Sequence, residues 1–232
     1  MELINKQVPD WMEQKFGANL DVGATAETLW ETGGLFTWQT AAEALEIVSG
    51  AAGDTGIVVS VYGLDANYDQ LTASVTTDGA DGTTPVAIAG VTFIRVFRVK
   101  VTTGTPTGIL TVRAVAGATV RATVTVGNNQ SQMALFTVPA GYFCWVKSYY
   151  ATVQKLKDVV LSLYARPFGE VFQLKNRVIG YEEHIQQIFD PPLQFSAKTD
   201  IELRAASSVA TADVYGGFAL LLRNQAAGPK NN

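Results

Sequence analysis

The chain has 232 residues, of which 47% are hydrophobic and 16% are charged, and its formal net charge at pH 7 is −4. The charged fraction is low against the roughly 25% of an average soluble domain, and the apolar content excludes a disordered chain. No apolar run approaches the roughly 20 residues of a membrane-spanning helix. The first ten residues lack the basic and apolar regions of a secretory signal, so none is expected. A single cysteine, Cys144, excludes an internal disulfide and a cysteine-cluster metal site.

Charge is unevenly distributed along the chain. Residues 1–94 contain two bases and thirteen acids, whereas residues 95–232 contain fifteen bases and eight acids. Two interpretations fit: the halves steer a partner or pair with the opposite half of a neighbouring copy, or they are solvated faces that merely differ in composition. The bases of the second half stand singly rather than in clusters, so we do not expect a nucleic-acid-binding surface.

Residues 1–40 form an aromatic-rich leader with little periodicity. Pro9-Asp10 indicates a short helix that continues to Lys15. The rest is too irregular to build its own core, so we expect an extended N-terminal arm. Its large side chains either bind a partner subunit or wrap over the chain's own sandwich. The candidate partner-binding residues are Trp11, Phe16, Trp30, Phe36 and Trp38.

Residues 41–127 contain short strand-like segments separated by Gly- and Asp-rich turns, which predicts an antiparallel β-sandwich. Segment 50–56 is expected to be a loop, and Asp54 a turn former rather than a cation ligand. No Gly-Lys-Ser/Thr follows this loop, so it is not a phosphate loop. The expected strands are 45–49, 57–62, 70–77, 85–89, 92–101, 108–115 and 119–126.

The polar segment 127–130 is the best internal boundary, and residues 128–223 form a second strand series. We expect Pro191 and Pro192 to end the strand that begins at His184, and residues 224–232 to be a loose tail. The expected strands are 133–138, 142–153, 158–165, 171–179, 184–189, 200–205 and 213–223. The predicted fold class is all-β, with two consecutive antiparallel sandwiches behind an N-terminal arm.

Little in the sequence points to catalysis. His184 is the only histidine and stands in an alternating apolar stretch, so a hydrolytic triad is not expected. Three carboxylate pairs occur, at Glu182/Glu183, Asp78/Asp81 and Asp200/Glu202. Turns or solvated strand faces explain each pair more simply than glycosidase chemistry. Dinucleotide, phosphate-loop and metal-ligand motifs are lacking. We therefore expect a protein that is not an enzyme, with no catalytic, cofactor-binding or metal-binding residues.

The aromatic stretch 142–150 allows two interpretations. Tyr142, Trp145 and Tyr149 are candidates for a sugar-stacking platform, whereas a buried strand face explains the same residues with less effort. Cys144 lies between two aromatic neighbours and is expected to be a small buried hydrophobe.

Five phrases carry a family resemblance. They are F-G-A-N-L-D-V-G with E-T-L-W-E-T-G-G-L-F-T-W (16–38), V-Y-G-L-D-A-N-Y (61–68), A-L-F-T-V-P-A-G (134–141), A-R-P-F-G (165–169) and F-D-P-P-L-Q-F-S-A-K-T-D-I-E-L-R-A (189–205). Over about residues 16–222 the chain resembles a virion protein that recurs in tailed bacteriophages, especially marine and cyanobacterial ones. The shared phrases are turns and strands rather than catalytic signatures.

The resemblance implies a decoration or cement protein, or a head-fibre base, that binds the outer capsid surface and stabilises the shell. It implies a jelly-roll-like module over residues 128–223 and a homotrimer. The implied partners are the major capsid protein and other copies of the chain, on the exterior of a virion assembled in the host cytoplasm. Cofactor, nucleic-acid and membrane partners are not expected. Two alternatives stay open: a tail-associated or portal-vertex adaptor, and a carbohydrate- or receptor-binding module.

Overall fold

The computed structural model describes residues 11–115, 117, 119–155, 157–181, 184–208 and 211–225. Every regular element within these ranges is a β-strand, so the all-β prediction is confirmed. The first part of the expected leader, the pair Glu182/Glu183 and most of the expected tail lie outside the described residues. In the described part of the chain, no helix is long and apolar enough to span a membrane.

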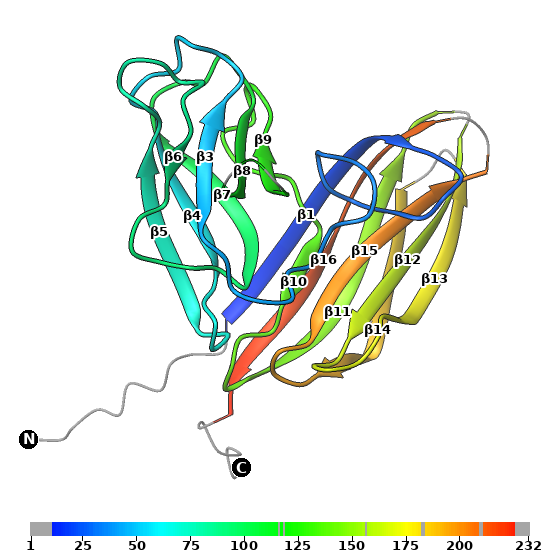
Figure 1. Cartoon of the computed structure of the whole chain (residues 1–232). Coiled ribbons are helices and arrows are strands. Elements are labelled where there is room, and N and C mark those ends of the chain that lie inside the picture. Colours follow the sequence, from blue (N-terminus) through cyan, green and yellow to red (C-terminus); the bar gives the residue numbers. More distant parts are fainter. Residues whose placement is uncertain are drawn as a thin grey trace, which may run out of the picture.

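Eight strands form a jelly roll (Figure 1). One sheet has the order β1-β16-β11-β14 and the other the order β10-β15-β12-β13, with the short β2 (Glu27–Thr28) added to β15. Numbered along the chain, these sheets read 1-8-3-6 and 2-7-4-5, which is the double Greek-key winding of a jelly roll. The strands are β1 (Trp11–Val22), β10 (Leu135–Thr137), β11 (Tyr142–Val153), β12 (Asp158–Arg166), β13 (Gln173–Tyr181), β14 (His184–Phe195), β15 (Asp200–Ser207) and β16 (Ala212–Asn224).

A second sandwich is inserted between the first and second strands of the jelly roll. Its sheets have the orders β6-β3-β8-β9 and β5-β4-β7. We call it the inserted sandwich; Figure 1 shows it as the cyan-to-green lobe beside the jelly roll. Its strands are β3 (Leu45–Ser49), β4 (Val58–Leu64), β5 (Gln70–Thr76), β6 (Val86–Ala87), β7 (Arg95–Thr103), β8 (Leu110–Ala114) and β9 (Val120–Val124).

The prediction of an extended arm and a short helix at the N-terminus is wrong for the described residues. Residues 11–22 form β1, which pairs antiparallel with β16 from Trp11↔Leu222 to Val22↔Ala212. The sequence pattern of these residues does not indicate a strand, because β1 places polar side chains on its inner side. Lys15, for example, is buried against β7 of the inserted sandwich. Polar groups with partners therefore occupy positions where apolar residues are expected in a sheet.

Strand β14 continues past the prolines that were expected to end it. Its ladder with β11 breaks after Ser148↔Ile188 and resumes at Val146↔Leu193, so residues 189–192 bulge out of the pairing. The Asp190–Pro191 peptide is cis. Proline is tolerated here because β14 is the last strand of its sheet, and its outer edge requires no N–H donors.

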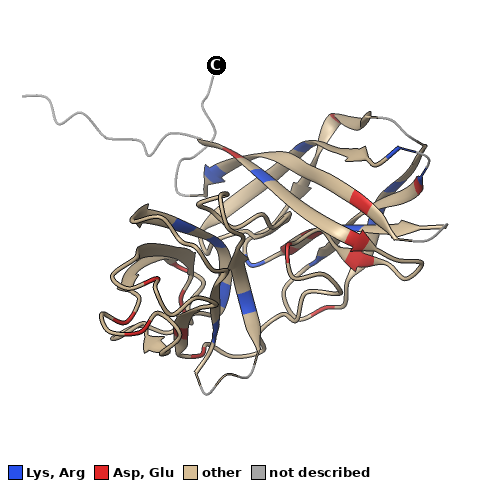
Figure 2. Cartoon of the chain, turned by 90° about the horizontal axis from the view of Figure 1, so that it is seen from above, with Lys and Arg blue, Asp and Glu red and all other residues tan. Residues whose placement is uncertain are grey.

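Part of the uneven charge of the sequence is paired within the chain. Three ion pairs join bases of the second half to acids of the first half, namely Arg98–Glu13, Arg113–Glu46 and Arg121–Glu43. Figure 2 shows Lys and Arg spread singly over strands of both lobes. The acidic and basic halves of the sequence therefore meet at these three ion pairs.

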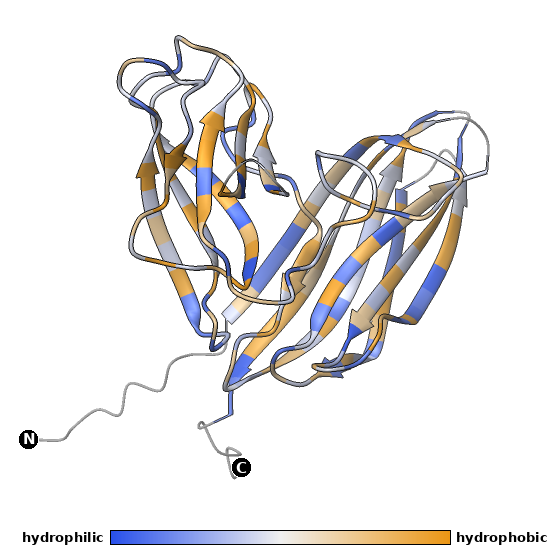
Figure 3. Ribbon diagram, viewed as in Figure 1, coloured by the Kyte–Doolittle hydropathy of each residue, from blue (hydrophilic) through white to orange (hydrophobic). Residues whose placement is uncertain are grey.

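Each sandwich has its own apolar core. Strands alternate between apolar and hydrophilic residues (Figure 3), and the apolar ones fill the space between paired sheets. Trp30 and Phe36, from the segment between β2 and β3, belong to the cluster of the inserted sandwich, together with Leu135 of the jelly roll. Phe97 packs against both clusters. Part of the segment that was expected to be an N-terminal arm thus fills the junction between the two lobes.

Candidate interaction surface

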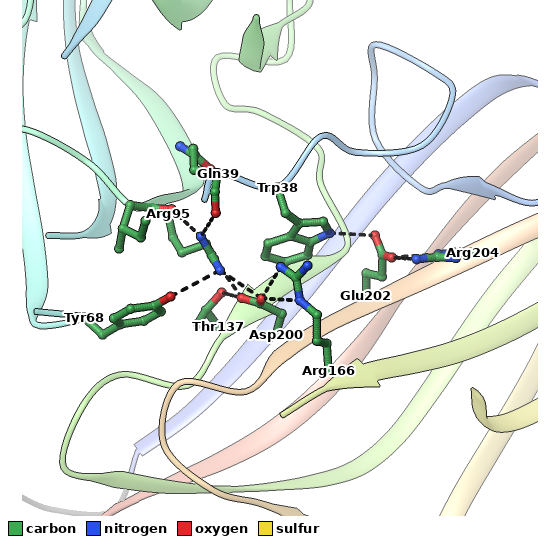
Figure 4. A network of polar contacts seen from close by, with 10 residues as sticks. Trp38, Gln39, Tyr68, Arg95, Thr137, Arg166, Asp200, Glu202 and Arg204 are labelled. Carbon is green, nitrogen blue, oxygen red and sulfur yellow. Dashed lines mark hydrogen bonds and ion pairs between the residues drawn. The ribbon is translucent and has the colours of Figure 1, made fainter. Parts of the chain in front are cut away.

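A buried ion-pair network joins the two sandwiches (Figure 4). Arg95 of β7 donates from Nε to Asp200 Oδ1 at 2.7 Å and from Nη2 to Asp200 Oδ2 at 2.9 Å. Thr137 donates to Oδ1 at 2.6 Å, and Arg166 donates to Oδ2 at 2.6 Å. Arg95 is 4% exposed and Asp200 is 2% exposed. With its oxygens occupied by donors from three strands, this carboxylate acts as a structural clamp.

A second buried carboxylate, Glu202, holds the segment that links the lobes. It accepts hydrogen bonds from Thr28 Oγ1 at 3.0 Å, Trp38 Nε1 at 3.4 Å and Arg204 Nε at 2.7 Å. Burial raises the pKa of Glu202, while Arg204 and the hydrogen bonds oppose that rise. The expectation that Asp200 and Glu202 lie on a solvated face is therefore wrong, because buried donors surround both carboxylates.

Most of the candidate partner-binding residues pack within the chain. Trp30 and Phe36 are each 5% exposed, and their ring centroids lie 5.0 Å apart. Trp38 continues this stack, 5.1 Å from Phe36. Trp11 contacts a tyrosine ring of β11 at 4.9 Å. Phe16 alone of the five counts as exposed, at 37%.

Residues singled out for chemistry are likewise held in structural roles. Cys144 is fully buried, and burial raises the pKa of its thiol, so it is unreactive. Burial would raise the pKa of Asp54, but hydrogen bonds from Ser49, Thr107 and Gly108 together lower it to about 2. Asp54 therefore ties two loops together. Within the described ranges, no three His, Cys, Asp or Glu side chains gather as metal ligands.

A buried amine lies where β1 meets the inserted sandwich. Lys15 Nζ donates to the carbonyl oxygen of Phe97 and lies 5.3 Å from the Phe97 ring centroid. Burial and the nearby Arg98 charge, opposed by Glu13, together lower the pKa of Lys15 to about 7. The Glu13–Arg98 ion pair lines an adjacent cleft of about 180 Å³. Ligand pockets span roughly 300–1,000 Å³, so this cleft is small for a ligand.

The outer face of the sheet β1-β16-β11-β14 is built differently from the rest of the surface. The register aligns its outward side chains in rows across the four strands. One row runs Met12, Leu221, Trp145, Gln194, and the next runs Gln14, Ala219, Ser148, Ile188. We call this surface the aromatic face; its residues are Met12, Gln14, Phe16, Trp145, Ser148, Tyr150, Thr152, Gln186, Ile188, Gln194, Tyr215, Gly217, Ala219 and Leu221.

The aromatic face is both apolar and solvent-exposed. Ile188 is 65% exposed, Met12 56%, Tyr215 49% and Phe16 37%. Lys147, the residue that the pairing of β11 skips, is exposed in the middle of this sheet, and Arg223 lies at one end of the face. A cluster of exposed large apolar side chains is typical of an interaction site. This face is therefore the candidate functional surface.

The three aromatics expected to form a sugar-stacking platform do not share a face. Tyr149 is fully buried and donates from its hydroxyl to Asn176 Oδ1. Tyr142 points to the same inner side as Cys144 and contacts the Trp11 ring. Trp145 is on the outer side, and its aromatic companion along β11 is Tyr150. The register shift at residue 147 causes this, because an extra residue reverses which side chains point outward.

No family model matches the chain, and no curated protein matches its sequence. Solved structures of infectious bursal disease virus are weakly similar. The Gt-strain structure shares 10% identity over 99% of this chain and 76% of that chain, with a TM-score of 0.25. The Gx-strain structure shares 10% identity with the same coverage and a TM-score of 0.28. A mutant VP2 protein of this virus shares 11% identity over 99% and 73%, with a TM-score of 0.27. Scores this low carry no conclusion about the role of this chain.

Proposed function

We propose that this chain is a structural protein of a tailed-phage virion that binds the outer capsid surface as a decoration, cement or head-fibre-base protein and stabilises the shell. The observation that carries the proposal is the aromatic face, a surface with several exposed large apolar side chains on an all-β body. The centres of protein interfaces are rich in Trp, Tyr, Phe and Met. The aromatic face presents Met12, Phe16 and Trp145 around a single lysine, Lys147.

The family resemblance supports the same role through the fold. A-L-F-T-V-P-A-G (134–141) contains β10 and the turn before β11, and residues 189–205 contain the bulge of β14 and most of β15. These phrases shape the jelly roll and its junction with the inserted sandwich. They include Asp200, the residue that clamps the lobes. What the resemblance shares is therefore the body that presents the aromatic face.

The proposed role is non-enzymatic. The strongest candidates for acid–base catalysis are Asp200 and Glu202. Their carboxylate oxygens accept hydrogen bonds from side chains that hold the fold together. His184 is exposed at one end of the aromatic face, beside the Tyr150 ring at 6.1 Å. A general base needs a nucleophile or a bound water within hydrogen-bond reach and a third group to orient it. Asp200 and Glu202 are almost fully buried, so neither is open to a substrate.

Imaging of the virion tests this proposal. The purified chain is added to capsids stripped of accessory proteins, and both reconstituted and native particles are reconstructed. We expect density with this two-lobed shape at many positions over the outer shell, and slower capsid disruption on heating when the chain is bound. A single ring at the portal vertex would instead support the adaptor alternative. Absence from the virion would overturn the proposal.

A further inference from the structure

We propose that β13 binds an extended acidic segment of another protein, which adds to the sheet β10-β15-β12-β13 as a further strand. This sheet lies opposite the one that bears the aromatic face. The inference goes beyond the proposed function and does not rest on it, because its test uses the purified chain without a virion. Failure of one proposal therefore leaves the other standing.

Strand β13 is the last strand of its sheet. Within the described residues it pairs with β12 alone, and Figure 1 shows it at the outer edge of the jelly roll. Residues 173–181 contain no proline, and residues 176–181 pair without a break with residues 158–163. The outer edge of this stretch is regular, unlike that of β14. An extended peptide can therefore add to it through backbone hydrogen bonds.

Two bases on β13 are held by neutral groups. Arg177 is exposed, and it donates from Nε to Ser162 Oγ at 3.0 Å and from Nη2 to the Tyr164 hydroxyl at 3.4 Å. Lys175 donates to Gln173 Oε1 at 2.7 Å. In the part of the chain that the structure describes, neither base has a carboxylate partner. A carboxylate on an added strand would supply one.

The charged groups farther across this sheet add to the positive charge. Two buried carboxylates, those of Asp200 and Glu202, hold three guanidinium groups, those of Arg95, Arg166 and Arg204 (Figure 4). Together these five groups carry a net positive charge. The potential around β13 therefore attracts an acidic segment.

The acids nearest to β13 lie beyond its ends. No Asp or Glu occurs within residues 171–181. Glu170 precedes the strand, and Asp158 is opposite its last residue. Glu182 and Glu183 follow the strand in the sequence and lie outside the described residues. The middle of the edge, around Arg177, is therefore open to an acidic partner.

The apolar side chains beside Arg177 favour a peptide over a polysaccharide or a nucleic acid. Ile179 is 73% exposed and Leu174 is 45% exposed. Arg177 and Ile179 are successive residues on the outer side of the sheet. A strand that alternates acidic and apolar residues on one side matches both. The open backbone edge pairs with a peptide backbone and has no counterpart in a sugar or a nucleic acid.

The same charges oppose a second copy of β13 as the partner. Two copies paired edge to edge would bring Arg177 and Lys175 of each close to those of the other, and like charges on adjacent strands repel. Basic side chains on outer strands commonly prevent such self-association. The edge therefore selects a strand of opposite charge.

Peptide binding to the purified chain tests the proposal. The probe is a synthetic peptide that repeats Glu-Thr-Val-Thr over the length of β13, so that Glu and Val alternate on one side. The control peptide has Lys in place of Glu. Fluorescence anisotropy at low salt measures both. We expect the acidic peptide to bind with a dissociation constant of about 100 μM or lower, at least about tenfold tighter than the basic peptide.

Variants of the chain locate the contact. Arg177→Glu should weaken binding of the acidic peptide about tenfold, because an attraction becomes a repulsion. Arg177→Lys keeps the charge and should bind within about threefold of wild type. Lys100→Glu makes the same change of net charge on the exposed outer side of the inserted sandwich and should bind like wild type. Melting temperatures of the variants control for folding.

Backbone measurements separate strand addition from a loose electrostatic contact. The acidic peptide should slow amide hydrogen exchange within residues 176–181. Two further peptides are N-methylated, one at Thr and one at Glu and Val, and at least one should lose binding because its backbone no longer pairs with β13.

Four outcomes overturn the proposal. They are equal binding of the acidic and basic peptides, normal binding of both methylated peptides, and no binding up to about 1 mM. The fourth is tighter binding of heparin or of a single-stranded oligo-dT through Arg177, which would assign the edge to another polyanion.

Discussion

The jelly roll and the inserted sandwich have similar cores but different outer faces. On the inserted sandwich, the outer side of β5-β4-β7 carries Ser60, Ser74 and Lys100, which face water. On the jelly roll, the outer side of β1-β16-β11-β14 carries large apolar side chains such as Met12 and Ile188 around the exposed Lys147. Because core packing is common to both lobes, the difference lies in the outer residues. Contact with a partner is therefore to be sought on the jelly roll.

The largest expected effect concerns the clamp that joins the two lobes. Asp200→Asn leaves Arg95 buried without its counter-charge, and removing one partner of a buried ion pair costs about 3–5 kcal/mol. We expect the free energy of unfolding, measured with urea at pH 7, to fall by that amount. Glu46→Gln, which breaks a more exposed pair within the inserted sandwich, should cost about 1 kcal/mol or less. An equal loss of unfolding free energy in both variants would show that the buried Asp200–Arg95 pair stabilises the fold no more than the Glu46–Arg113 pair.

A smaller effect tests whether β1 belongs to the jelly roll. A Cβ at Gly17 would lie 2.0 Å from the Leu29 carbonyl oxygen and 2.5 Å from the Ala134 nitrogen, and both are backbone atoms. We expect Gly17→Ala to lower the free energy of unfolding by about 2–3 kcal/mol, because backbone must shift to make room. Gly79→Ala in the inserted sandwich is the control, since a Cβ there meets nothing within 4 Å. If Gly17→Ala melts at the wild-type temperature, β1 does not pack closely against Leu29 and Ala134.

The smallest effect is a pH dependence at the junction. The pKa of Lys15 is about 7 in the folded chain and near 10.5 when exposed, so between these values the unfolded chain binds more protons. Stability therefore rises with pH above about 7, by at most about 1.4 kcal/mol per pH unit. Glu13 and Arg98 face the amine in this range. Lys15→Met should remove the rise between pH 7 and 8.5.

Comparison with the wild-type chain is needed at higher pH. The pKa of Cys144 is raised by burial, so above about pH 8.5 the unfolded chain loses its thiol proton first, and the contribution of this thiol to stability falls as pH rises. The difference between wild type and Lys15→Met isolates the amine. The same slope in both chains would show that Lys15 stays charged when folded.

Several strand positions in the second half of the chain were predictable from residue type and turn signals. The expected strand 142–153 is β11 with the same bounds, and β15 begins at Asp200 as predicted. The role of residues 11–22 was hidden, because Glu13, Lys15 and Asn19 are polar residues satisfied by β7 or by the β2 region. The pairing of β1 with β16 also joins opposite ends of the chain. No local pattern reports a partner at that separation, so the insertion within the jelly roll was not predictable.

The aromatic face was only partly visible in the sequence. Trp145 stood out by type, but strict alternation groups it with Tyr149 rather than Tyr150. The bulge at residue 147 reverses that parity. Ile188, Met12 and Tyr215 come from three other strands and join the face only through register.

The bulge of β14 has a consequence for how large an assembly grows. An unpaired outer strand normally templates the addition of further strands, which leads to open-ended fibres. Here residues 189–192, with two adjacent prolines, interrupt the outer strand of the sheet that bears the aromatic face. Residues 189–192 therefore oppose the lateral addition of a further strand along this edge.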